Sequence, residues 1–200
     1  ILENNKGNIT VDTMKSILRS HHKSVKNNQF TKHSLKSVCM HGGFLYGDHT
    51  TGSYVASLNE KLCTYWVTGS STPCISTFKP LWLVPGEKFS FSEEQKDEAI
   101  EFWKKRETLH RYILENKLLD LELYLNKKNK LEEELCSLVN DLNVNNFNSN
   151  QLIEIMDFAL ARENDLITSI IKSSKNNVRK INGNPYFKYY WNKQNKRFYT

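Results

Sequence analysis

Histidine and hydroxyl side chains are concentrated in one short stretch of the chain. His41, His49, Thr50, Thr51 and Ser53 lie on either side of a glycine-containing loop. A serine or threonine hydroxyl needs a neighbouring base to become a nucleophile, and a histidine can supply it. However, no acidic residue has the spacing of a catalytic triad, so local loop contacts explain the pattern as well as catalysis does. These five side chains are therefore candidates for lining a substrate pocket, and the glycines match no phosphate-binding pattern.

The cysteines, Cys39, Cys63, Cys74 and Cys136, are the second group able to do chemistry. Their spacing is neither that of zinc ligands nor that of a disulfide framework, so we expect no metal and no cofactor. A free cysteine in an apolar context usually acts as a small buried side chain, which favours a reducing, cytoplasmic location. Cys74 follows a proline and could be exposed and reactive, but no fixed base is evident beside it, and burial is favoured there too.

Motifs between residues 38 and 80 resemble one known family. They are Val38-Cys-Met-His41, Thr50-Thr-Gly-Ser53, Trp66-Val-Thr-Gly69 and Pro73-Cys-Ile-Ser-Thr-Phe-Lys-Pro80. In this order they resemble the C-terminal half of the secernins and the related dipeptidases. Those proteins are N-terminal-nucleophile (Ntn) hydrolases, in which a cysteine at the mature amino terminus attacks an amide. The resemblance extends from about Ile9 to the first long helix.

The resemblance implies an α+β fold, the C-terminal part of an αββα sandwich in which two antiparallel sheets pack face to face with helices outside. It also implies a peptidase acting on dipeptides or other small amides. In such enzymes the α-amino group, whose ordinary pKa is about 7.7–8.0, can act as the base. Because the chain begins with Ile1, we expect the nucleophile upstream and no catalytic residue here. The alternative is a catalytically silent interaction or structural protein that retains the fold.

Composition sets few further limits. The chain is 38% hydrophobic and 25% charged, as in an ordinary soluble domain. Its net charge of +6 permits an anionic partner, but no recognised nucleic-acid-binding motif accompanies the charge. No apolar run approaches the ~20 residues that span a bilayer. We therefore expect no nucleic acid and no membrane. The expected partners are the upstream N-terminal half of the same protein and a small peptide or amide substrate, and a homo-oligomer is possible.

Residues 1–90 are expected to form the strand-rich part of the core, with one leading helix. Thr10 is a suitable cap for that helix, which should run from about 10 to 22. Alternating β-branched and aromatic residues predict four strands. These strands are expected at 37–41, 50–58, 62–68 and 81–84. The second and third should form an antiparallel hairpin, because only a short polar segment separates them.

Two expectations concern the faces of this sheet. On the second strand Thr51, Ser53 and Val55 should share one face, and the opposite face should carry Tyr54, Ala56 and Leu58, because side chains alternate along a strand. The strongly apolar surroundings of Trp66 and Phe78 predict that both are buried.

Residues 91–180 are expected to form a helical part packed on the core. The first of three helices should be capped by Ser92 with Gln95 and reach about residue 125, with a break at 126–129. The second should cover the apolar positions from 131 to 142, and Ser149 should cap the third. Residues 181–200 form an aromatic, basic tail. Such a tail can stack on single-stranded nucleic acid, but a half-buried edge strand protected by lysines is favoured.

Overall fold

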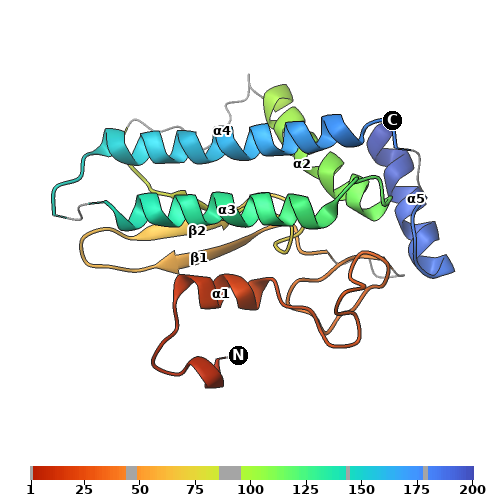
Figure 1. Cartoon of the computed structure of the whole chain (residues 1–200), viewed down its shortest axis with the longest axis horizontal. Coiled ribbons are helices and arrows are strands. Elements are labelled where there is room, and N and C mark those ends of the chain that lie inside the picture. Colours follow the sequence, from red (N-terminus) through yellow and green to blue (C-terminus); the bar gives the residue numbers. More distant parts are fainter. Residues whose placement is uncertain (1, 44–48, 86–95, 143–144, 178–179) are drawn as a thin grey trace.

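The computed structural model describes residues 2–43, 49–85, 96–142, 145–177 and 180–200 (Figure 1). In chain order its elements are the 3-10 turn η1 (Glu3–Asn5), α1 (Val11–Leu18), β1 (Ser53–Ser57), β2 (Thr64–Thr68), β3 (Lys79–Leu81), α2 (Lys96–Leu114), α3 (Leu121–Asn140), α4 (Ser149–Ser174) and α5 (Pro185–Tyr199). The predicted α+β class is confirmed. Among the described residues, no helix is long and apolar enough to cross a membrane.

The strands form one antiparallel sheet in the order β1-β2-β3. The predicted hairpin is confirmed, with Ser53 opposite Thr68 and Ser57 opposite Thr64. β3 lies on the other side of β2 and starts two residues earlier than the predicted fourth strand. The predicted strand at 37–41 is wrong. This segment is irregular because its backbone makes isolated hydrogen bonds, such as the one from Cys39 N to Ser20 O (3.1 Å), instead of a ladder.

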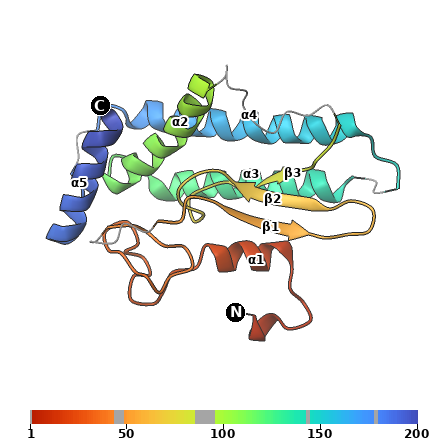
Figure 2. The ribbon, with the colours of Figure 1, turned by 180° about the vertical axis from the view of Figure 1, so that it is seen from behind.

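One face of the sheet is covered by helices and the other is open. Val55 and Trp66 are opposite each other in the hairpin, are 7% and 3% exposed, and pack against side chains of α1, α3 and α4. Tyr54 points the other way and is 71% exposed. Figure 2 shows the strands in front of α3 when the molecule is seen from behind. The predicted alternation of Val55 and Tyr54 and the predicted burial of Trp66 and Phe78 are confirmed.

Helix boundaries follow local capping. Thr10 caps α1 through a capping box with Thr13, as predicted, but the helix ends at Leu18. The break after α2 lies at residues 115–120 instead of 126–129. There Asn116 has a φ of 52°, and the Asp120 side chain accepts a hydrogen bond from Leu123 N (2.8 Å), which starts α3. Ser92 and Gln95, the predicted cap of the first long helix, lie outside the described residues.

Asn148, one residue before the predicted cap Ser149, caps α4.

The predicted edge strand in the tail is wrong, because residues 185–199 form α5. Asn184 caps this helix and Pro185 occupies its first turn, where a proline costs no hydrogen bond. Phe187 and Trp191, four residues apart, fall on one helical face and are both buried. Aromatic residues interleaved with lysines therefore misled the prediction.

Buried carboxylates connect the helices to the strand region. Glu163 of α4 is 2% exposed and pairs with Lys79 Nζ at 2.8 Å and Arg106 Nη2 at 2.6 Å. Glu132 of α3 accepts from the backbone N of Phe78 at 2.7 Å and pairs with Arg19. Each carboxylate therefore joins segments that are far apart in the sequence.

Candidate metal centre

Four possible metal ligands meet between α1 and the loop after β2. His21, Cys39, His41 and Cys74 each offer a nitrogen or sulfur atom, and these atoms all lie within 4.8 Å of one another. His21 follows the end of α1, Cys39 and His41 belong to the irregular segment before β1, and Cys74 lies in the turn before β3. We call this set the Cys/His cluster. None of its members lies in a helix or a strand.

His41 Nε2 is the centre of the cluster. It lies 3.1 Å from His21 Nε2, 3.6 Å from Cys39 Sγ and 3.4 Å from Cys74 Sγ. The hydroxyl of Thr72 lies 3.4 Å from the same nitrogen and 3.2 Å from Cys74 Sγ. Cys39 and His41 are buried, and His21 and Cys74 are partly buried. The donor atoms are thus gathered at one point with limited access to solvent.

Arg19 fixes the turn that carries Cys74 to the end of α1. Its guanidinium donates to the carbonyl oxygens of Pro73 and Ser76, each at 2.9 Å. The same guanidinium pairs with Glu132, which lies on α3. Because Arg19 is close to His21 in sequence and bonds beside Cys74, these contacts hold two members of the cluster next to each other.

The two thiols differ in acidity. The hydrogen bond that they share, together with burial, raises the pKa of Cys39. The same hydrogen bond, with further ones to His21 and His41, lowers the pKa of Cys74 well below its ordinary value of 9.0. The environment therefore favours the thiolate of Cys74, which is the form that binds metals and reacts as a nucleophile.

Buried polar side chains continue from the cluster towards α2 and α5. The His49 ring lies 6.1 Å from that of His41 and 4.8 Å from that of His110, measured between centroids. Burial and the nearby histidines lower the pKa of His49 to about 2. Trp191 covers this region and donates from Nε1 to the carbonyl oxygen of Gly42 at 2.9 Å. Gly43 next to it has a φ of 153°, and a Cβ there would meet the ring of Phe187.

The predicted pocket residues differ in their contacts. His41 joins the Cys/His cluster, and His49 lies beside it and accepts a hydrogen bond from Gly42 N at 3.1 Å. Thr50 accepts from Met40 N at 3.0 Å and donates to the carbonyl of Val38, so its hydroxyl satisfies backbone groups. Thr51 is exposed and Ser53 is half-buried. Only the two histidines are thus brought together with other reactive side chains.

Sequence reasoning missed the cluster because it considered each cysteine separately. His41 Nε2 stands beside Cys74, so the statement that Cys74 has no neighbouring base is wrong. Cys63 and Cys136 remain free and half-buried. The ligands come from four positions with irregular intervals, which match no zinc-finger spacing. One feature of the sequence did point to the site, namely the Cys39-x-His41 pair. Side chains two residues apart lie on the same side of an extended chain, so both could serve as ligands to one ion.

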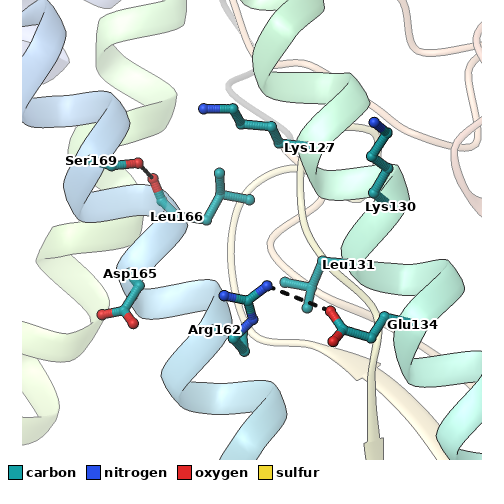
Figure 3. Close-up of a pocket in the computed structure, with 8 residues that line it drawn as sticks. All are labelled: Lys127, Lys130, Leu131, Glu134, Arg162, Asp165, Leu166 and Ser169. Carbon is teal, nitrogen blue, oxygen red and sulfur yellow. Dashed lines mark hydrogen bonds and ion pairs between the residues drawn. The ribbon is translucent and has the colours of Figure 1, made fainter.

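Figure 3 shows a separate pocket between α3 and α4, with a volume of about 420 Å³. Its charged side chains are of both signs: Lys127, Lys130, Glu134, Arg162 and Asp165. Arg162 Nη2 pairs with Glu134 Oε2 at 3.6 Å across it. The mixed charges favour no one class of ligand, and the Cys/His cluster remains the better-defined site.

No family model, no curated protein and no solved structure matches this chain.

Proposed function

We propose that the chain is the C-terminal half of a secernin-like amide hydrolase, a cytoplasmic peptidase for dipeptides or other small amides. In this proposal the nucleophilic cysteine and the second sheet of an αββα sandwich belong to an N-terminal half upstream of residue 1. The chain supplies one sheet, its outer helices and part of the wall of the substrate pocket. The proposal rests on the sequence motifs and on one structural observation, the open face of the sheet.

The open face has the character of a surface that another sheet covers. Tyr54 and Val67 face each other in the hairpin, and so do Ala56 and Tyr65. Tyr54 and Ala56 are exposed, while Tyr65 and Val67 are half-buried. Along β1, helices cover one face and Tyr54 and Ala56 are exposed on the other, which is what each half of an αββα sandwich presents before the two sheets pack, about 10 Å apart. This arrangement supports the proposed pairing with an upstream half.

The segments that carry the family resemblance also converge. His41 Nε2 of the first motif lies 3.4 Å from Cys74 Sγ of the fourth, and Thr68 of the third motif accepts a hydrogen bond from Ser53 N of the second at 2.9 Å. Motifs that are distant in sequence and adjacent in space are expected when they build one functional region. Because these contacts lie at one end of the hairpin, the proposal assigns the pocket wall to that end of the sheet.

The activity is tested by comparing the full-length protein with this chain alone. The full-length protein should hydrolyse dipeptides or N-acyl amino acids, and alkylation of thiols should abolish the activity. Replacing the terminal cysteine of the mature enzyme by alanine should do the same, whereas Cys63→Ser should not. Turnover by this chain alone that survives alkylation would show that the chemistry lies elsewhere.

The sheet pairing has its own test. Tyr54→Lys on the open face should leave the stability of this chain nearly unchanged, but it should destabilise the full-length protein, because a lysine would be buried between two sheets. Tyr189→Lys is the matched control, since Tyr189 of α5 is equally exposed, at 70%. Equal effects of the two substitutions on the full-length protein would argue against a second sheet on this face. If Tyr54→Lys destabilises the full-length protein more than Tyr189→Lys does, but the protein hydrolyses no amide, the result would favour the alternative of a catalytically silent structural protein that retains the fold.

A further inference from the structure

We infer that the Cys/His cluster is a structural zinc site in which His21, Cys39, His41 and Cys74 bind one Zn²⁺ ion. The inference does not depend on the amide-hydrolase proposal, because it concerns metal binding and its readout is metal content.

The distances from His41 Nε2 to the other three donor atoms fit a tetrahedron around one ion. With Zn–N bonds of about 2.0–2.1 Å and Zn–S bonds of about 2.3 Å, tetrahedral ligands lie about 3.3 Å apart for two nitrogens and about 3.6 Å apart for a nitrogen and a sulfur. His21 Nε2 and His41 Nε2 are 3.1 Å apart. The two sulfur atoms lie 3.6 Å and 3.4 Å from His41 Nε2. These three separations are those of zinc ligands, and all four donor atoms lie within 4.8 Å of one another.

Hydrogen bonding alone accounts poorly for this arrangement. An imidazole nitrogen carries either one hydrogen or one lone pair, so it makes one good hydrogen bond. His41 Nε2 has four polar neighbours, on His21, Cys39, Cys74 and Thr72. A single cation bound by His21, Cys39, His41 and Cys74 instead satisfies these four donor atoms together. Zinc binding thus explains why two histidines and two cysteines face each other inside the protein.

The ligand types select the metal. Two thiolates and two imidazoles are a zinc set, whereas Mg²⁺ and Ca²⁺ require oxygen ligands. The set is complete with four protein ligands, which is the composition of a structural site, because a catalytic zinc keeps one position for water or substrate. Thr72 is buried, and its hydroxyl can donate to the sulfur of Cys74 at 3.2 Å as an outer-shell partner.

The position of the site explains what the ion would do. The ligands join the end of α1, the irregular segment before β1 and the turn before β3. From residue 19 to residue 43 the described chain has no helix or strand, and its fully buried apolar side chains are Val25 and Cys39. A stretch with so small a core needs another source of order, which a metal cross-link provides.

The experiment measures zinc in the full-length protein purified under reducing conditions. We expect one equivalent per chain that a strong chelator removes and that Zn²⁺, but not Mg²⁺ or Ca²⁺, restores. Cys39→Ser and Cys74→Ser should each lose the zinc, while Cys63→Ser and Cys136→Ser, the two remaining cysteines, should keep it. Thr72→Val should weaken zinc binding by about 10–100-fold.

Cobalt provides a test that does not depend on whether the variants fold. Co²⁺ added to the metal-free wild-type protein should give the intense visible bands of tetrahedral cobalt and a near-ultraviolet sulfur-to-cobalt charge-transfer band. A wild-type protein that takes up neither ion under reducing conditions would overturn the inference. So would equal zinc loss in Cys63→Ser and Cys74→Ser, or an octahedral cobalt spectrum without the sulfur band.

Discussion

The helical layer and the irregular region are held together in different ways. The helical layer, α2 to α4 with the covered face of the sheet, buries apolar side chains from each element, among them Leu135, Ala159 and Ile167. The irregular region, residues 19–43 with the turn at 70–77, buries few apolar side chains, chiefly Val25, Cys39 and Ile75, and polar contacts of Arg19 and the Cys/His cluster join its segments. Apolar burial is non-directional and tolerates small shifts, whereas hydrogen bonds and metal ligands require defined geometry. The two regions should therefore respond to different perturbations.

The largest effect on the helical layer is expected from Glu163→Gln. This substitution leaves Lys79 and Arg106 facing each other without a counter-charge, and breaking a buried ion pair typically costs about 3–5 kcal/mol. Urea unfolding at neutral pH measures the loss. Glu134→Gln is the matched control, because its pair with Arg162 is exposed and should contribute at most about 1 kcal/mol. Similar losses in both variants would show that burial does not strengthen the Glu163 interactions.

The same carboxylate predicts an acid dependence. Burial opposes the ionisation of Glu163, but Lys79 and Arg106 outweigh it and hold its pKa below the ordinary value of 4.5. A depressed folded-state pKa stabilises the protein above pH 4.5, and this contribution is lost as the pH falls below that value. The difference in stability between wild type and Glu163→Gln should therefore shrink on acidification below pH 4.5. If this difference in stability does not change with pH, the effect of Glu163→Gln comes from altered packing and not from the lost charge.

Removal of the metal should affect the irregular region first. At a free zinc concentration 1,000-fold above its dissociation constant, binding adds about 4 kcal/mol, which corresponds to roughly 8–16 °C in melting temperature for a chain of this size. Hydrogen exchange of the metal-free protein should rise between residues 19 and 43 while the amides of α3 and α4 stay protected. If hydrogen exchange rises equally in residues 19–43 and in α3 and α4, the two regions form one cooperative unit.

A smaller effect is expected where α5 meets the irregular region. Trp191→Phe removes the hydrogen bond from Nε1 to the carbonyl of Gly42 and leaves that oxygen buried, at a cost of about 1–3 kcal/mol. Hydrogen exchange near Gly42 should increase, whereas Tyr189→Phe on the exposed side of α5 should change nothing. An unchanged exchange rate in Trp191→Phe would show that other contacts hold this segment.

The elements that local sequence patterns predict correctly are those whose contacts are local. The α+β class, the hairpin and the buried Trp66 and Phe78 follow from local alternation and apolar runs. The strand at 37–41 and the edge strand in the tail failed, because alternating aromatic or β-branched residues do not show whether a partner strand is present. In the tail, Asn184 and Pro185 are a helix start that local alternation concealed.

The candidate site was the least predictable part. Its ligands span residues 21 to 74, and the contacts that bring them together include those of Arg19 with the turn before β3. Nothing in local spacing encodes such long-range proximity. His41 was identified as a pocket candidate, but its partners His21, Cys39 and Cys74 were not grouped with it. Site residues that come from irregular segments therefore require the tertiary structure before they can be recognised.

The bond between Trp191 and Gly42 has a consequence for the order of events during synthesis. It joins residues 149 positions apart, so it cannot form until Trp191 has been made. At about 5–20 residues per second, roughly 7–30 s pass between the appearance of Gly42 and that of Trp191. During this interval the histidines beneath Trp191 lack their cover. The nascent protein therefore passes through a stage in which these side chains are open to metal ions and water, and α5 covers them only after Trp191 has been made.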